Sequence, residues 1–317
     1  MRVTEFIEKA KKTLVSYEIL PPLKGRSIQS IYNILDPLME FKPPFINVTY
    51  HREDYIYKKA GDDNFQKVVV RKRPGTVGIC AAIMNRYKVD AVPHLICGGF
   101  TKDSTEDALI DLSFLGINNV LLIRGDAAKS EAVFTPEPKG NQYASDLVQQ
   151  VVNMNNGVYL ADDLKNAKPT DFCIGVAGYP EKHFEAPNMT SDIKYLKQKV
   201  DLGADYIVTQ MFFDNQKYFK FLDAAAAAGI NVPIIPGIKP IAVKRHLQLL
   251  PQVFKIDLPE ELITEVEKCK DNKAVRQVGI EWAIKQSEEL RKAGVPVLHY
   301  YSMGKSDNIK AIASKLF

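Results

Sequence analysis

Short apolar segments, each followed at once by a polar residue, recur eight times along this chain. They lie at 15–22, 43–51, 90–99, 118–126, 172–183, 205–214, 232–240 and, with a weaker pattern, 296–305. Strands buried on both faces read as nearly continuous Val, Ile and Leu runs, and helices between such strands imply a parallel sheet. Eight strand–helix units close into a (β/α)8 barrel. We therefore predict an α/β fold of this type.

The chemistry of (β/α)8 barrels takes place at the carboxyl ends of the strands. The polar residues at these ends are Glu18, Thr49, His94, Arg124, Asp126, Tyr179, His183, Gln210 and Lys239. The same pattern that predicts the fold therefore also supplies a set of candidate site residues.

Length and composition agree with one barrel. The chain has 317 residues, of which 46% are hydrophobic, and a barrel commonly needs roughly 250. No Pro/Gly/Ser-rich linker or block of charge divides the sequence, so we expect a single domain over 1–317. The segment 257–294 reads as two helices, more than one barrel unit requires, which predicts extra C-terminal helices.

Charge and cysteine usage narrow the class of partner. A net charge of +4 does not suggest a nucleic-acid-binding protein, but it suits a small anionic ligand. We find no signal-peptide core and no run of membrane-spanning length, so we expect no membrane association and a cytoplasmic location. The four cysteines form no CxxC pair, which favours reduced thiols and no metal site.

Helical periodicity places several other segments. Val3, Phe6, Ile7 and Ala10 predict a helix that plugs the bottom of the barrel. Further helices are expected at 104–116, opened by Ser104, and at 224–228, closed by Gly229. Residues 153–170 look like an insertion before the fifth strand, and the sequence leaves open whether it is a lid or an interface.

The segment after the fifth strand is the most informative locally. Thr190 or Ser191 can cap the next helix, which Gly203 ends and whose stripe Ile193, Leu196 and Val200 faces the barrel. Asp192, Tyr195 and Lys199 share a second face. Together with His183 and the helix N-terminus, this face suits a diphosphate, but an ordinary solvated polar face fits the spacing equally well. The sequence has neither a Rossmann nor a P-loop motif.

Nine motifs in register carry a resemblance to a known family. They are YEILPP (17–22), NVTY (47–50), PHLIC (93–97), LIRGD (122–126), YASDLV (143–148), AGYPEKH (177–183), KVDLGAD (199–205), TQMFFD (209–214) and IPGIKP (235–240). In this order they resemble the catalytic barrel of the methylenetetrahydrofolate reductase family.

The resemblance implies an FAD-dependent flavoprotein of one-carbon metabolism and methionine biosynthesis. NADH or NADPH would reduce FAD, which would then reduce 5,10-methylenetetrahydrofolate to 5-methyltetrahydrofolate in a ping-pong reaction. It also implies a homo-oligomer, a dimer or tetramer, and we expect a catalytic barrel without the regulatory domain of eukaryotic members. The sequence does not distinguish NADH from NADPH.

Three residues resemble the family's catalytic set. Glu18 corresponds to the general acid that protonates a ring nitrogen of the folate, and we expect burial to hold its carboxyl group neutral. Asp126 corresponds to the aspartate beside flavin and pterin. Gln210 corresponds to the glutamine that contacts pterin and, in the other half-reaction, the nicotinamide.

The resemblance also implies a set of flavin contacts. These are Thr49, Tyr50, His94, Arg124, Gly125, Asp126, Tyr143, Ala144, Tyr179, His183, Asp192, Tyr195, Gln198 and Lys199. The substrate contacts would be Glu18, Asp126, Gln210 and Lys305.

The chain departs from the family pattern at four places. Charged residues 51–54 replace a small Gly-Ala-rich turn. Tyr195 and Gln198 stand where Asn and Arg are expected, and Lys305 stands where an arginine would touch substrate. Leu250 falls where an aromatic residue often stacks on the aminobenzoate group.

Alternatives remain open at this stage. Another FAD-dependent barrel oxidoreductase, of the proline-dehydrogenase type, would share the fold and cofactor. A flavin-free folate-binding barrel would share the substrate. The basic residues Lys239, Lys244, Arg245, His246 and Lys305 either hold a folate's glutamate tail as flexible rim side chains or form an ordinary solvated rim.

Overall fold

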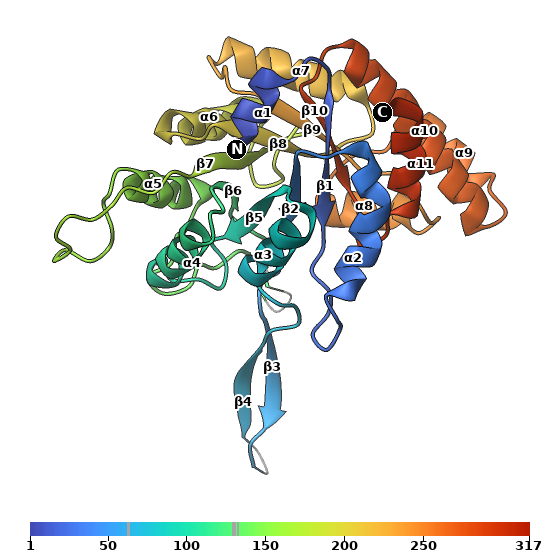
Figure 1. Ribbon diagram of the computed structural model, residues 1–317. Helices are drawn as coiled ribbons and strands as arrows, with labels where there is room; N and C mark the ends of the chain where they lie inside the picture. The colour runs from blue at the N-terminus through green and yellow to red at the C-terminus, as the bar shows by residue number, and fades with distance from the viewer. Residues whose placement is uncertain (62–63, 129–130, 132) are drawn as a thin grey trace.

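Eight parallel strands close into a barrel, as predicted (Figure 1). The computed structural model describes all residues except 62, 63, 129, 130 and 132. In order around the barrel, the strands are β1 (Leu14–Ile19), β2 (Phe45–Val48), β5 (Asp90–Ile96), β6 (Asn119–Ile123), β7 (Cys173–Gly178), β8 (Tyr206–Met211), β9 (Ile234–Ile238) and β10 (Val297–Tyr301).

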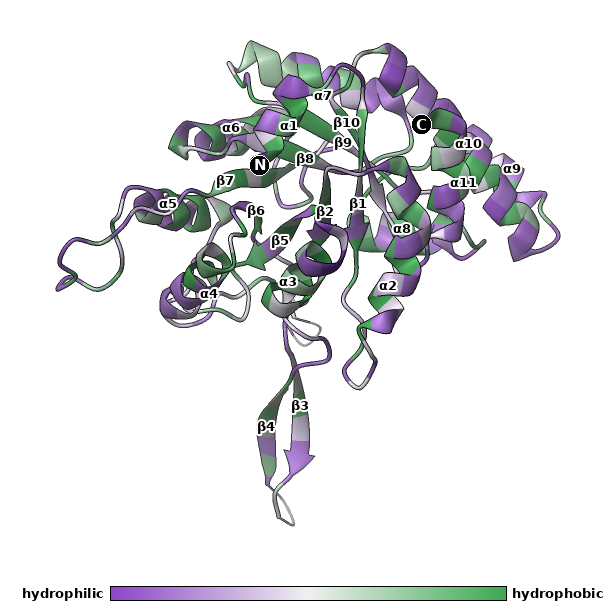
Figure 2. Cartoon of the chain, viewed as in Figure 1, coloured by the Kyte–Doolittle hydropathy of each residue, from purple (hydrophilic) through white to green (hydrophobic). Residues whose placement is uncertain are grey.

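Helices connect these strands and surround them. They are α1 (Val3–Lys9), α2 (Gln29–Leu35) with the 3-10 helix η1 (Asp36–Phe41), α3 (Thr76–Tyr87), α4 (Lys102–Phe114), α5 (Ala144–Asn155), α6 (Met189–Leu202), α7 (Asn215–Ala227), α8 (His246–Phe254), α9 (Glu260–Glu267), α10 (Asn272–Lys292) and α11 (Asp307–Leu316). The expected extra helices after the seventh strand are α9 and α10. In the described part of the chain, no helix combines the length and apolarity needed to cross a membrane, and Figure 2 shows polar and apolar residues mixed along them.

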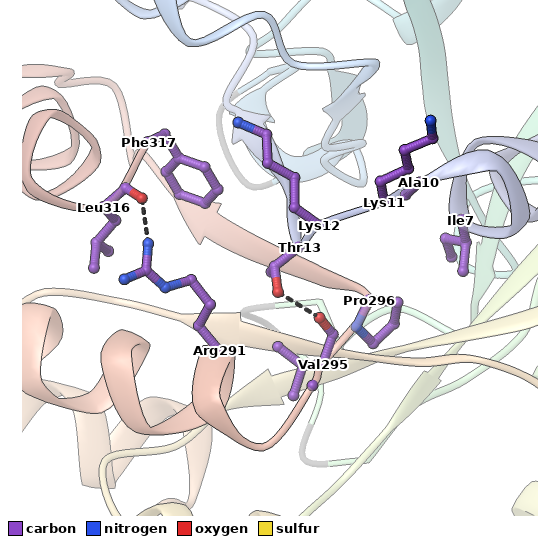
Figure 3. A pocket seen from close by; sticks show the side chains of 11 residues that line it. Ile7, Ala10, Lys11, Lys12, Thr13, Arg291, Val295, Pro296, Leu316 and Phe317 are labelled. Atoms are coloured by element: carbon purple, nitrogen blue, oxygen red, sulfur yellow. Dashed lines mark hydrogen bonds between the residues drawn. The ribbon is translucent and has the colours of Figure 1, made fainter.

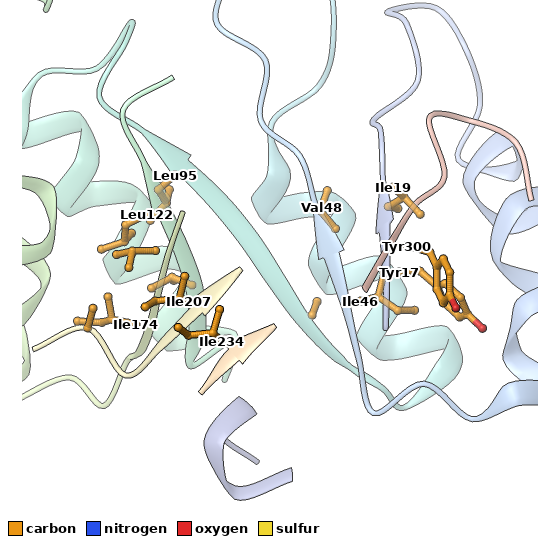
Figure 4. Close-up of a cluster of buried hydrophobic side chains, with 14 of the residues drawn as sticks. Tyr17, Ile19, Ile46, Val48, Leu95, Leu122, Ile174, Ile207, Ile234 and Tyr300 are labelled. Atoms are coloured by element: carbon orange, nitrogen blue, oxygen red, sulfur yellow. The ribbon is translucent and has the colours of Figure 1, made fainter. Parts of the chain in front are cut away.

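Alternate residues along each strand divide between two cores, because successive side chains of a strand point to opposite faces. One set fills the space between strands and helices; Figure 4 shows part of it, including Ile19, Val48 and Ile234. The other set fills the lumen and includes Phe45, Tyr206, Val208, Ile235 and Val297. Each large apolar side chain buried in this way contributes roughly 1.5–3 kcal/mol to folding.

The N-terminal helix plugs the bottom of the lumen, as the sequence predicts. Val3 of α1 is fully buried in the lumen cluster, and Phe6 and Ile7 pack against the same cluster. The backbone N–H of Val3 donates to Asn119 Oδ1 at 2.9 Å, which ties α1 to the amino end of β6. The lumen is therefore closed at this end, and a ligand can enter only from the carboxyl ends of the strands.

Three helices begin earlier than expected, and α7 does so at Asn215 rather than at residue 224. Asn188, rather than Thr190 or Ser191, caps α6, because its extended backbone lets Oδ1 accept a hydrogen bond from the Ser191 N–H at 2.8 Å. Thr101 caps α4 in the same way, with Ser104 already inside the helix. Gly203 ends α6 as predicted.

A β-hairpin that the sequence did not predict follows β2. Its strands are β3 (Asp54–Lys59) and β4 (Phe65–Val70), which pair antiparallel and extend away from the barrel in Figure 1. At its base, the Lys24 N–H donates to the Lys72 carbonyl at 2.7 Å, and the Arg73 guanidinium donates to the Pro21 carbonyl. The hairpin is thereby joined to the loop after β1, at the carboxyl end of the barrel.

The segment 153–170 joins the end of α5 to the start of β7. Gly157 has a left-handed φ of +76°, which ends the helix, and the Thr170 N–H donates to the Met154 carbonyl at 3.0 Å. The Asn155 side chain receives hydrogen bonds from Thr170 and from the Phe172 N–H. This segment lies at the amino end of β7, away from the carboxyl ends of the strands, so it does not cover the barrel mouth.

Candidate active site

The carboxyl group of Glu18 occupies the lumen at the carboxyl end of β1. Thr49 Oγ1, just beyond β2, donates a hydrogen bond to Glu18 Oε1 at 2.8 Å. His94 Nε2 on β5 lies 3.6 Å from Glu18 Oε2, and a hydrogen bond of 3.3 Å joins the same nitrogen to Asn47 Oδ1. The structure therefore brings together three of the predicted residues, Glu18, Thr49 and His94.

A second imidazole, which the sequence pattern did not predict, faces the same carboxylate. His299 on β10 is fully buried, and its Nε2 lies 3.7 Å from Glu18 Oε2. Its Nδ1 shares a hydrogen bond of 2.7 Å with Ser16 Oγ on β1. The signal that could have found it is alternation: His299 has the same parity as Val297, which faces the lumen.

The protonation of Glu18 differs from the expectation of an acid held neutral by burial. Burial raises the pKa of Glu18, but His94, His299 and the Thr49 hydroxyl group act against it, so the net pKa lies below its usual value. Burial also lowers the pKa of His94 to about 4. At neutral pH the ligand-free site therefore holds an ionised Glu18 beside a neutral His94.

A second group of predicted residues lies at the ends of β6 and β7. Arg124 forms a two-pronged ion pair with Glu185, with distances of 2.6 and 2.8 Å, and its guanidinium lies over the Phe134 ring. Gly125 has a φ of +83°, and a Cβ there would come within 3.3 Å of Ile96. Glycine is therefore required for the turn that presents the exposed Asp126 carboxylate after β6.

The loop between β7 and α6 is fixed from within. Asp192 Oδ2 accepts a hydrogen bond from the His183 N–H at 2.9 Å, and the Tyr179 and His183 rings meet edge to face at 4.8 Å. Lys199 Nζ donates to the Ala177 carbonyl at 2.7 Å, and burial lowers the pKa of this lysine to about 8. Asp192 and Lys199 thus face the barrel end, which sets them apart from a merely solvated face.

Other predicted flavin contacts lie on the surface around this group. Tyr143 caps α5, which begins at Ala144, and its side chain is 52% exposed. On α6, Tyr195 is 53% exposed and Gln198 is exposed. No hydrogen bond or ion pair joins Tyr143, Tyr195 or Gln198 to the Glu18 group, so their role depends on what binds between α5 and α6, two helices packed side by side.

The charged loop after β2 crosses to the loop after β6. Arg52 Nη1 lies 2.9 Å from Glu131 Oε2, and Nη2 lies 3.3 Å from Glu137 Oε1. Its side chain also packs against Gly98. The charged turn that departs from the family pattern is therefore an inter-loop connection, and Tyr50 beside it packs on Phe100 with ring centres 5.0 Å apart.

The opposite side of the lumen is formed by β8, β9 and β10. Gln210 is partly buried near the carboxyl end of β8, where the pairing with β9 shifts register between Val208 and Met211, and its Oε1 accepts a hydrogen bond from the Met211 N–H at 2.9 Å. Tyr301 Oη donates to the Thr209 carbonyl at 2.6 Å. Gln210 therefore lies at the same end of the barrel as Glu18.

The structure corrects one expectation for the basic rim, at Lys239, and also places Leu250, whose substrate contact the sequence leaves open. Lys239 is not a flexible rim residue: it is only 6% exposed, because it directly follows β9 and continues the lumen-facing parity. Leu250 is 2% exposed in a separate apolar cluster beneath α8, so it cannot stack on a substrate in this arrangement. Lys244, Arg245 and Lys305 are exposed as expected, and His246 is half-buried.

A cavity lies at the other end of the barrel. It has a volume of about 560 Å³ and is lined by residues from the end of α1, the start of β10 and the C-terminus, among them Lys12, Arg291 and Phe317 (Figure 3). This is the amino end of the strands, where barrels hold stabilising rather than catalytic residues. Among the described residues, no group of three His, Cys, Asp or Glu side chains could hold a metal ion.

Comparisons with known proteins point to one family. A family model described as methylenetetrahydrofolate reductase matches residues 2–317. Methylenetetrahydrofolate reductase 1 of Schizosaccharomyces pombe is 32% identical over 308 residues, covering 96% of this chain and 46% of that protein. The 5,10-methylenetetrahydrofolate reductase of Escherichia coli is 30% identical over 303 residues, covering 95% of this chain and 90% of that protein. The chain thus spans about half the length of the yeast relative.

One solved structure is similar in fold. It is an uncharacterised protein from Clostridium thermocellum described as binding two copies of 5-methyl-5,6,7,8-tetrahydrofolic acid. The TM-score is 0.59 at 16% identity, over 98% of this chain and 96% of the other. This likeness supports the barrel fold.

Proposed function

The chain belongs to the methylenetetrahydrofolate reductase family, and we propose that it reduces 5,10-methylenetetrahydrofolate to 5-methyltetrahydrofolate with NADH or NADPH as the electron donor and FAD as the carrier. The observation that carries this proposal is Glu18, a carboxyl group inside the lumen with hydrogen-bonding and imidazole partners on three neighbouring strands. Such a group suits a proton transfer that must occur before hydride can reach the folate carbon.

Glu18 would protonate a nitrogen of the folate's five-membered ring, which opens the ring to an electrophilic iminium. Since Glu18 is ionised in the ligand-free protein, it must take up a proton as the substrate binds. A pterin that fills the lumen would exclude the remaining water from the carboxylate, and desolvation raises a carboxyl pKa. The neutral His94 would then be a hydrogen-bond partner of Glu18, and the Glu18 carboxyl group would donate the proton.

Asp126 and Gln210 would orient the substrate from two sides. The Asp126 carboxylate can accept hydrogen bonds from the pterin amino group and stabilise the iminium cation. The Gln210 amide offers both a donor and an acceptor, which suits the pterin in one half-reaction and the nicotinamide in the other. Lys305, exposed after β10, would lie nearer the tail of the substrate than its reacting ring.

The chemistry of the β6–β7 residues fits FAD. Arg124 follows β6, and Lys199 donates to the Ala177 carbonyl near the end of β7, so this end of the barrel holds two cations, which suits a diphosphate. Tyr143 and Tyr195 offer exposed rings. FAD bound there would supply a two-electron carrier between the nicotinamide and the folate. Glu185 must release Arg124 if the guanidinium is to contact the diphosphate. The remaining proposed flavin contacts are His94, Thr49, Tyr50, Gly125, Ala144, Tyr179, His183, Asp192 and Gln198.

An anaerobic titration tests this function. We expect a yellow flavin spectrum that bleaches on addition of NADH or NADPH and returns on addition of methylenetetrahydrofolate. Colourless protein that binds folate would favour a flavin-free folate-binding barrel. A flavin that is reduced but not reoxidised by the folate would favour another FAD-dependent barrel oxidoreductase.

A further inference from the structure

Lys239 is a buried cation for which the described part of the chain provides no partner. It is 6% exposed, and no hydrogen bond or ion pair of its ammonium group occurs among the described residues. Burial lowers the pKa of Lys239 to about 8. An ammonium group that loses most of its solvent contact gains from a partner with negative charge, so this position suits an anionic ligand.

The strand register directs Lys239 toward the lumen. Ile235 belongs to the lumen cluster, whereas Ile234 and Ile238 belong to the outer cluster, so parity places Lys239 on the lumen side. On the neighbouring strand β10, Tyr300 pairs with Ile238, which puts Tyr301 beside Lys239. Tyr301 in turn pairs with Glu18 on β1.

Glu18 and Lys239 are therefore the two charged ends of one row across three adjacent strands. Two strand spacings amount to about 10 Å. A folate has its reacting nitrogens at one end of an aminobenzoyl group and its glutamate at the other, a span of similar length. On this basis, and resting on the proposed folate reduction, we propose that Lys239 binds a glutamate carboxylate of the folate while Glu18 faces the reacting ring.

The surroundings of Lys239 favour the folate over the other ligands. The residues proposed for FAD lie at β2, β5, β6 and β7; β5 is opposite β9 in the barrel, and β8 separates β7 from β9. His246 interacts with Lys239, and burial together with Lys239 lowers the pKa of His246 to about 4, so it adds no charge at neutral pH. The exposed Lys244 instead donates through Nζ to the Glu267 carbonyl at 2.9 Å. Lys239 is thus the buried cation of this loop, and a substrate carboxylate that enters the lumen could bind to its ammonium group.

The test compares Lys239→Met with the wild type in their flavin-loaded forms, by calorimetric titration. The two ligands are 5-methyltetrahydrofolate and its dimethyl ester, in which the glutamate carboxylates are neutral. We expect the variant to bind the folate about 10- to 100-fold more weakly, as for loss of a charged hydrogen bond, and to bind the ester as the wild type does. Lys244→Met is the matched control and should leave both affinities unchanged.

Any other result of these titrations contradicts either the role of Lys239 or the proposed function. If Lys239→Met weakens folate and ester alike, or neither, the carboxylate role is overturned although the proposed function stands. If the wild-type protein binds neither ligand, the proposed function fails and the inference with it. Should Lys239→Met fail to fold, Lys239→Gln carries the same comparison with a polar side chain.

Discussion

Thr49 Oγ1 donates a hydrogen bond of 2.8 Å to Glu18 Oε1 across the β1–β2 pair. The proposed acid is therefore held from the neighbouring strand rather than by residues close to it in sequence. His94 and His299 face its other oxygen from β5 and β10. This arrangement leaves Glu18 little freedom and makes its protonation depend on three other strands.

Glu18→Gln should separate the two half-reactions. The amide keeps the shape of the side chain but has no acidic proton, so folate reduction should fall by about 10²–10⁴-fold. Flavin reduction by NADH or NADPH should continue, because it needs no proton from Glu18. Stopped-flow absorbance of the flavin measures both steps. Equal slowing of the two would show that Glu18 is structural.

His299→Gln should move the pH profile of the folate half-reaction. His299 helps to lower the pKa of Glu18, so its loss should raise that pKa. An acid with a higher pKa stays protonated to higher pH, and the alkaline decline in rate should shift upward. Single-turnover rates between pH 6 and pH 9 measure this, with flavin reduction as the internal control. A smaller rate with an unmoved profile would contradict a link through Glu18.

The purified protein should release non-covalent FAD on denaturation, and Lys199→Met should weaken FAD binding. The ammonium of Lys199, in the last turn of α6, donates to the Ala177 carbonyl near the end of β7, where the diphosphate is proposed to sit. Chromatography of the released flavin and an affinity titration of the apoprotein check both statements. Lys194→Met, an exposed lysine of the same helix, is the control. Finding FMN in place of FAD would remove the role given to α6.

Lys239→Met should stabilise the ligand-free protein most at neutral pH. The folded pKa of about 8 lies below the ordinary 10.5, so between these values the unfolded chain binds a proton that the native state does not. The free energy of unfolding of the wild type therefore rises with pH in this window, and the cost is fully present below about pH 8. The variant avoids a cost of roughly 3 kcal/mol. Urea unfolding at pH 7 and pH 10 measures the gap, which should shrink at the higher pH. A gap that does not change with pH would show that Lys239 is not a buried charge.

The sequence by itself determined the barrel and the positions of its chemistry. Eight apolar runs each ended at a polar residue. Strands as apolar as these must be buried on both faces, which indicates parallel strands covered by helices. Glu18, Thr49, His94 and Gln210 were found because strand ends are local features. The plug formed by Val3, Phe6 and Ile7 followed from helical spacing in the same way.

Only the tertiary structure decided which of these side chains meet. His299 and Glu18 lie 281 positions apart in sequence, and closing β10 against β1 brings them to 3.7 Å. The burial of Lys239, the lowered pKa of Glu18 and the link from Arg52 to the loop after β6 likewise depend on barrel register and loop crossing. These are contacts between residues far apart in sequence. The alternation of residues along a strand tells which face a side chain occupies, but it does not tell which side chain of another strand or loop lies next to it.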